Sequence, residues 1–168
     1  MRKLFTIMSA ALGALALIFS AAATVQATDY TCTGAIGAQR FENLEVPAGA
    51  SCTLNGTRVD GNIFVRSNAT LTANGVIVGG NIQAEGAAAV TVGGSATVDG
   101  DIQVKQGGGA TVSQVRVNGN IQLESNRSAL SVTFSQVGGA VQVFQNRGGA
   151  AISDNRIDGN LQCKENNP

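Results

Sequence analysis

Val59-Asp60-Gly61-Asn62-Ile63 recurs five more times with little change, and this short segment decides the fold. The intervals between successive copies are 19, 20, 19, 20 and 20 residues, and the later copies begin at Val78, Val98, Val117, Val137 and Ile157. A constant period of about 20 residues is typical of proteins in which each repeat is one structural unit stacked on the next. The chain therefore predicts a stack of similar units.

Apolar residues alternate with polar residues when the copies are aligned. One apolar column contains Ile63, Ile82, Ile102, Ile121, Val141 and Leu161, and a second contains Val65, Ala84, Val104, Leu123, Val143 and Cys163. Alternation with period two predicts β-strands with one buried face. One repeat cannot bury its own apolar edge, whereas stacked repeats share a continuous core. Two strands are expected in each repeat, with a short third strand around the first Val.

These observations predict an all-β fold, a parallel β-helix or solenoid of about seven coils with 19–20 residues each. A β-sandwich also has short strands at even spacing, but it does not need the same side chain every 19 or 20 residues. A left-handed helix of hexapeptide repeats would show multiples of six residues, so we predict a right-handed coil. The third position of each copy is glycine, which fits a corner that needs either a positive φ or the absence of a Cβ that would press on the adjacent coil. A strand follows these glycines, whereas a phosphate-binding glycine loop requires the start of a helix.

Residues 1–27 have the features of a secretory signal. Arg2 and Lys3 precede an apolar run from Leu4 to about Phe19, and small residues lead to Ala27. This order of segments is typical of a leader that is cleaved after Ala27, and the run is short and weak for a membrane span. We therefore predict a secreted or periplasmic mature protein in an oxidising compartment, with no transmembrane span after cleavage. The predicted organisation is 1–27 signal peptide, 28–58 N-terminal cap and first coil, and 59–168 β-helix repeats.

Cys32 and Cys52 are 20 residues apart, which is one repeat interval. In a parallel stack this spacing puts both residues in one column with Cα atoms about 5 Å apart, so we predict a disulfide between them. Cys163 is the third cysteine, and it falls in an apolar core column. It is either a small buried residue of the last coil or a thiol that awaits a partner. An uncovered last coil would allow stacking or dimerisation with a second copy.

The composition excludes several classes of function. The 11 basic and 11 acidic residues become 9 and 11 when Arg2 and Lys3 leave with the signal, and no basic block suggests a nucleic-acid partner. No His is present to serve a Ser nucleophile. The closest acidic pair, Asp99 and Asp101, fits turn positions and offers few ligands for calcium. We predict no catalytic residues, no metal and no cofactor, and therefore no enzyme.

Two sets of outward side chains are candidate contact surfaces. The aligned hydroxyl residues resemble the threonine arrays of some ice-binding solenoids, although Thr is also a common exposed strand residue. Exposed phenylalanines could contact a glycan or another cell-surface component. These candidates are Thr53, Thr72, Thr91 and Thr111 in one set, and Phe64 and Phe144 in the other.

The segment 46–54 (Val-Pro-Ala-Gly-Ala-Ser-Cys-Thr-Leu), followed by repeats of Val-x-Gly-Asn-Ile-Gln, resembles secreted bacterial β-helix repeat proteins of unassigned function. The Val-x-Gly-Asn/Asp-Ile repeat is also similar to that of bactofilins, which form cytoskeletal polymers. The resemblance covers about residues 30–165 and implies a β-helix that could assemble with itself. We expect a secreted, non-enzymatic structural or surface-interaction module, with a bactofilin-like polymer, an ice-binding protein and a carbohydrate-binding protein as alternatives.

Overall fold

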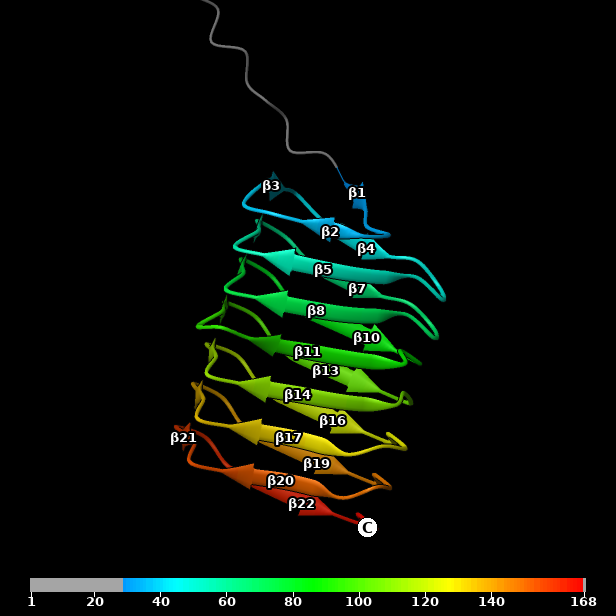
Figure 1. The fold of residues 1–168 in the computed structure, drawn as a ribbon. Helices are drawn as coiled ribbons and strands as arrows, with labels where there is room; N and C mark the ends of the chain where they lie inside the picture. The colour runs from blue at the N-terminus through cyan, green and yellow to red at the C-terminus, as the bar shows by residue number, and fades with distance from the viewer. Residues whose placement is uncertain (1–28, 168) are drawn as a thin grey trace, which may run out of the picture.

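The computed structural model describes residues 29–167, which form a parallel β-solenoid of about seven turns without any helix in that range. The strands form three parallel sheets that run the length of the molecule (Figure 1). Sheet A contains β1 (Tyr30–Thr31), β4 (Leu44–Val46), β7 (Ile63–Val65), β10 (Ile82–Glu85), β13 (Ile102–Lys105), β16 (Ile121–Glu124), β19 (Val141–Phe144) and β22 (Leu161–Lys164).

Sheets B and C complete each coil. Sheet B contains β2 (Ala35–Ile36), β5 (Ser51–Asn55), β8 (Thr70–Asn74), β11 (Ala89–Gly93), β14 (Gly109–Ser113), β17 (Leu130–Thr133) and β20 (Ala150–Ser153). Sheet C contains β3 (Arg40–Phe41), β6 (Arg58–Val59), β9 (Ile77–Val78), β12 (Thr97–Val98), β15 (Arg116–Val117), β18 (Gln136–Val137) and β21 (Arg156–Ile157). The short strands of sheet C are the expected third strands around the Val of each repeat.

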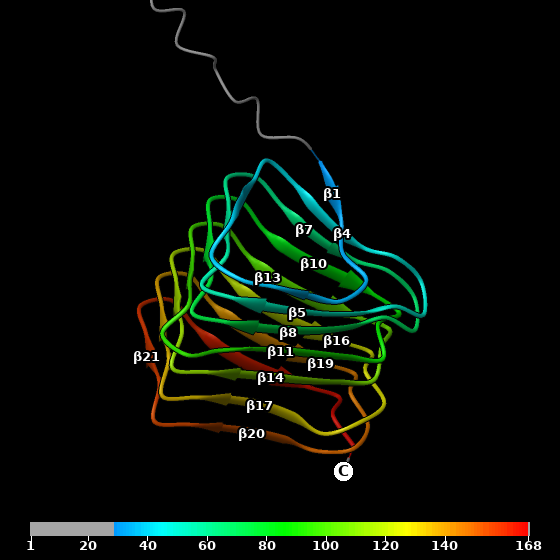
Figure 2. The same cartoon turned by 45° about the horizontal axis from the view of Figure 1, so that its top comes forward.

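The three sheets enclose one core with a roughly triangular outline (Figure 2). In Figure 1 the strands of sheet B run leftward in front and those of sheet A rightward behind while the chain descends, which makes the coil right-handed. The predicted signal peptide, residues 1–27, lies outside the described range.

The register of sheet A confirms that residues one repeat apart are neighbours. Ile82 pairs with Ile63 and with Ile102, and Ile102 pairs with Ile121. All four side chains are fully buried, so they form a single interior file. Fully burying such a side chain contributes roughly 1.5–3 kcal/mol, which makes these files the main source of stability.

The glycine of each repeat is required by close packing between coils. A Cβ on Gly100 would lie 2.7 Å from the carbonyl oxygen of Gly80 in the preceding coil. Gly80 has the same relation to Gly61, at 2.7 Å, and neither glycine has a positive φ. The absence of a side chain, and not left-handed backbone geometry, therefore explains this column.

A ladder of polar side chains holds the corner between sheets C and A in register. The Oδ1 atom of Asn62 accepts hydrogen bonds from the backbone N–H of Asn81 at 2.8 Å and from its Nδ2 at 3.0 Å. Asn81 in turn accepts from the N–H of Asp101, and Asp101 accepts from the N–H of Asn120. Each side chain thus satisfies a backbone donor of the next coil that would otherwise lack a partner.

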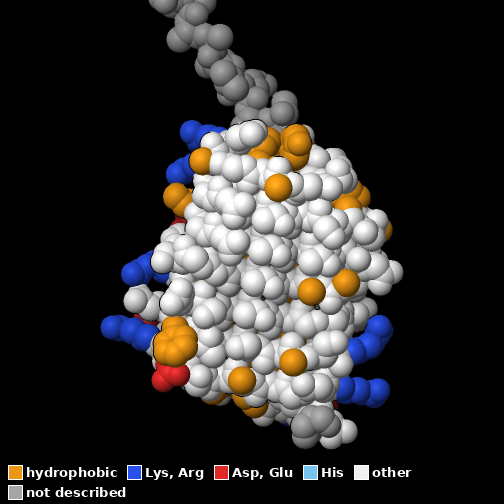
Figure 3. Space-filling model, viewed as in Figure 1, with side chains coloured by type: hydrophobic (Ala, Val, Ile, Leu, Met, Phe, Trp, Pro, Cys, Tyr) orange, Lys and Arg blue, Asp and Glu red, His pale blue; other side chains and the backbone are white. Residues whose placement is uncertain are grey.

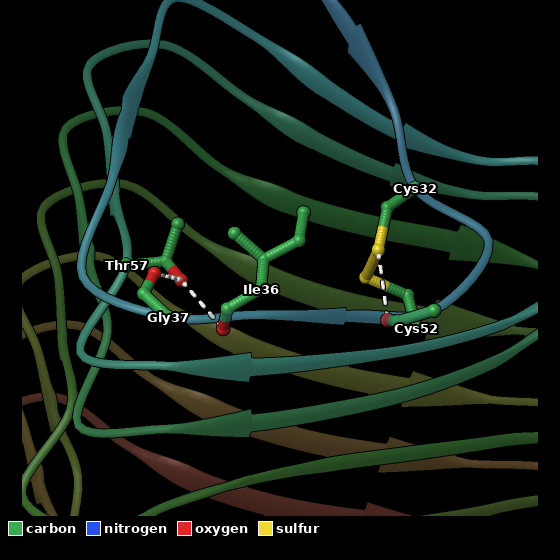
Figure 4. Close-up of a disulfide and its surroundings, with 6 residues drawn as sticks. Cys32, Ile36, Gly37, Cys52 and Thr57 are labelled. Carbon is green, nitrogen blue, oxygen red and sulfur yellow. Dashed lines mark hydrogen bonds between the residues drawn. A yellow bond between two sulfur atoms is a disulfide. The ribbon is translucent and has the colours of Figure 1, made fainter.

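The predicted disulfide between Cys32 and Cys52 is confirmed, with Cα atoms 5.6 Å apart (Figure 4). Both cysteines are about 1% exposed. A cross-link that closes a loop of 20 residues contributes roughly 3 kcal/mol, mainly by restricting the unfolded chain.

The expectation that these cysteines share one column was wrong. The N–H of Cys32 donates to the carbonyl of Glu45, so Cys32 lies in sheet A beside Val46. Thr53 donates to the carbonyl of Gly34, which places Gly34 and not Cys32 next to Cys52 in sheet B. The physical reason is a short first coil, because Tyr30 pairs with a residue only 14 positions later, Leu44. The disulfide therefore spans the narrowed corner between two sheets.

The two described ends of the solenoid differ in burial. In the first coil Ile36 and Phe41 are 7% and 8% exposed, and the Tyr30 ring lies 4.6 Å from the Phe41 ring. In the last coil Cys163 pairs with Val143 in the expected core column, yet its side chain is exposed and free. Leu161 is 50% exposed for the same reason, since no described residue packs on its outer side.

Candidate functional site

The outer face of sheet B is flat and carries no charge. The seven strands of sheet B contain no Lys, Arg, Asp or Glu, and their outward positions hold only Thr, Ser, Asn, Ala and Gly. Figure 3 shows this face, with charged side chains only at its margins. The structure brings the predicted threonines together here as one outward file, and the register pairs Thr53 with Thr72, Thr72 with Thr91, and Thr91 with Thr111.

An aromatic residue that we did not single out from the sequence lies at the edge of this face. Phe134 directly follows β17, is 63% exposed, and has a φ of 50°. This φ is a property of the corner, because Gln114 and Asp154 occupy the equivalent positions of the neighbouring coils with φ values of 58° and 57°. The sequence signal was available, because Phe134 falls in the turn column where earlier coils have Gly56 and Gly75 at positive φ.

The outer face of sheet A is charged and contains a groove. This groove of about 830 Å³ runs along the solenoid axis, and its lining includes Phe64, Arg66, Gln83, Gln103, Lys105 and Arg127. The predicted contact residue Phe64 is half-buried there, with the Arg66 guanidinium 5.4 Å from the ring centre. The second predicted phenylalanine, Phe144, also points outward from sheet A but lies four coils away.

Most charged side chains of sheet A and of the adjoining sheet C take part in ion pairs. Arg66 bonds to Glu45 at 2.7 Å, and Lys105 lies 3.7 Å from Glu124 in the next coil. Glu45 raises the pKa of Arg66, mainly through this hydrogen bond, so the guanidinium stays charged. Lys105 therefore pairs with the coil after it, whereas Arg66 pairs with the coil before it.

The corner between sheets A and B holds a buried asparagine ladder, which the sequence reasoning missed. Asn146 is 1% exposed and accepts bonds from the N–H and the Nδ2 of Asn126, at 2.9 and 3.1 Å. Its own Nδ2 donates to the carbonyl of Leu123 at 2.8 Å. Arg127 and Arg147 directly follow these two asparagines and point outward. The signal was the interval of 20 residues that separates each pair.

Several acidic residues of the described chain make structural contacts. Asp101 accepts the N–H of Asn120 at 2.7 Å, which explains its place in the corner ladder. Asp60 bonds to Arg40 and Arg58, and the Arg40 bond is the main reason that its pKa lies below the usual value. Within residues 29–167 no three Cys, Asp or Glu side chains gather as a potential metal site.

Comparison of the chain with protein-family profiles, with curated proteins and with solved structures found no match. No helix of the described part is long and apolar enough to span a membrane. Evidence for a function therefore comes from the outer surfaces of the solenoid.

Proposed function

We propose that this protein is a non-enzymatic, extracytoplasmic surface-interaction module that binds a neutral polysaccharide through the outer face of sheet B. The observation that carries this proposal is the uncharged, flat face with the 63%-exposed Phe134 at its edge. The disulfide between Cys32 and Cys52 supports a location outside the cytoplasm, where such bonds persist.

The chemistry of this face fits a hydroxyl-bearing, uncharged polymer. Thr, Ser and Asn side chains donate and accept hydrogen bonds, and a face without charge does not have to desolvate an ion when a neutral partner covers it. The parallel strands repeat these groups about every 4.8 Å, which suits a partner with a regular repeat. An exposed aromatic ring adds apolar contact area at the edge, which favours a sugar polymer over an ice lattice.

The test is co-sedimentation of the protein with insoluble neutral polysaccharides such as cellulose and chitin. We expect binding by the wild type, and a loss of at least about tenfold in affinity for Phe134→Ala and for Thr91→Glu, which places a charge in the middle of the face. Phe64→Ala on sheet A is the matched aromatic control and should bind as the wild type does. No binding to neutral polysaccharides, or ice adsorption that Thr72→Tyr and Thr111→Tyr abolish, would overturn the proposal.

A second candidate function is self-assembly through the last coil. Its support is the exposure of Leu161 and Cys163 in columns that are buried from β4 to β19. In the first coil Ile36 and Phe41 are nearly buried and, of the large apolar side chains, only Tyr30, at 42%, is exposed, so the last coil is the more open end and favours a dimer of two last coils over a head-to-tail filament. Size-exclusion chromatography with light scattering distinguishes a monomer, which would exclude this function, from a dimer or a filament.

A further inference from the structure

Two arginines at equivalent positions of adjacent coils form no salt bridge within residues 29–167. Six of the nine basic residues in this range form salt bridges: Arg40, Arg58, Arg66, Lys105, Arg156 and Lys164. Arg116, Arg127 and Arg147 form none within residues 29–167. The last two occupy equivalent positions of adjacent coils, so their backbones are about 4.8 Å apart. Both side chains are exposed, so an anion that spans the two coils can bind both guanidinium groups.

The backbone beneath the two arginines is held rigidly. The N–H of Arg127 donates to the carbonyl of Gly107 at 3.0 Å, and that of Arg147 donates to the carbonyl of Asn126 at 2.7 Å. The buried ladder of Asn126 and Asn146 lies one residue before them. The backbone of both arginines is therefore already ordered, which reduces the conformational entropy that is lost when a ligand binds.

The side chains around Arg127 and Arg147 indicate the chemistry of the ligand. Arg127 lines both the groove of about 830 Å³ on sheet A and a second hollow of about 560 Å³, which Arg147 also lines. The groove continues past Lys105 over the amides of Gln83 and Gln103 toward the Phe64 ring. Cations in three successive coils, amides for hydroxyl groups and an aromatic ring together match a carboxylated sugar chain laid along the axis.

Acidic side chains along the same path argue against a denser polyanion. Glu85 lines the groove and Glu165 lines the second hollow, where it accepts a hydrogen bond from Gln145 at 2.9 Å. These carboxylates would repel a backbone with a phosphate at every unit, whereas a polymer with carboxylates on sugar rings can place hydroxyl groups beside them.

From this arrangement we infer that the corner between sheets A and B is a second binding site, specific for an acidic polysaccharide. Arg127 and Arg147 bind its carboxylates, and the groove of sheet A binds the adjoining sugar units. This site lies on a different surface from the uncharged face of sheet B, so each site can fail while the other remains.

The experiment measures affinity for polygalacturonate and alginate by isothermal titration calorimetry at low salt, with uncharged dextran and single-stranded DNA as comparison ligands. We expect the acidic polysaccharides to bind, and the variant Arg127→Gln/Arg147→Gln to lose at least about tenfold in affinity. Arg116→Gln is the matched control, because Arg116 is also exposed and unpaired but lies in sheet C. Thermal melts followed by circular dichroism verify that all variants are folded.

Three results would overturn this inference. They are no binding of either acidic polysaccharide, an equal loss of affinity in Arg116→Gln, and tighter binding of DNA than of the acidic sugars. The Thr91→Glu variant separates the two proposals, because it should bind acidic polysaccharide as the wild type does.

Discussion

Replacing Asn146 by Leu, a residue of similar shape, tests whether the buried asparagine ladder stabilises the solenoid. The change removes the acceptor of two donors of Asn126, its backbone N–H and one hydrogen of its Nδ2. The other Nδ2 bond of Asn126, to the carbonyl of Val104 at 2.9 Å, remains. Asn126 is fully buried, so water cannot replace the lost acceptor.

The magnitude follows from these two unsatisfied donors. Each costs about 1–3 kcal/mol when it stays buried, which gives roughly 2–6 kcal/mol for the pair. Burying the leucine side chain offsets roughly 1–2 kcal/mol of this loss. We therefore expect the free energy of unfolding to fall by about 2.5 kcal/mol, the difference between the midpoints of these two ranges.

Urea unfolding followed by circular dichroism is the appropriate assay, since the chain has no Trp and a single Tyr as fluorescent reporters. The control is Asn118→Leu, an exposed amide that bonds to Asp99 at 3.0 Å on the surface. It should change stability by no more than about 0.5 kcal/mol. If Asn146→Leu and Asn118→Leu were equally stable, the ladder would contribute nothing and this reasoning would be wrong.

Two further predictions concern the coil corners and pH. Gly100→Ala places a Cβ 2.7 Å from a carbonyl oxygen of the preceding coil and should lower stability by about 1–3 kcal/mol in urea unfolding, whereas Gly34→Ala, which meets no atom within 4 Å, should not. The bonds from Arg40 and Arg58 lower the pKa of Asp60, so its contribution is present above its unfolded pKa of about 3.9 and is lost as the pH falls through the folded value. The melting temperature of Asp60→Asn should therefore fall less than that of the wild type between pH 5 and 2, and parallel curves would contradict this assignment.

The sequence was sufficient for the parts of the fold that repeat. Ile82, Ile102 and Ile121 form one interior file because a parallel stack puts residues one period apart on the same side. Val90 and Val92 also stay in register with Ala110 and Val112, although they stand one residue farther from the Val of their own repeat. Strict periodicity leaves little freedom in register, because a shift of one residue would turn every apolar side chain outward.

The sequence was insufficient where the period breaks. The spacing of Cys32 and Cys52 equals one repeat by coincidence, and only the short first coil shows that they belong to different sheets. Phe134 could be aligned with earlier glycines, but its 63% exposure depends on how the corner turns. The groove beside Arg127 depends on the projection of loops from several coils, which no local pattern describes.

Because the two described ends are closed unequally, we expect the solenoid to begin unfolding at one of them. A covalent clasp between Cys32 and Cys52 secures one extremity, while at the other β20, β21 and β22 rely on a single neighbour each. Mechanical pulling or proteolysis should therefore unfold the solenoid coil by coil from residue 167 toward the N-terminal end, releasing about 20 residues at each step. Reduction of the Cys32–Cys52 disulfide would allow unfolding to begin at both ends of the solenoid.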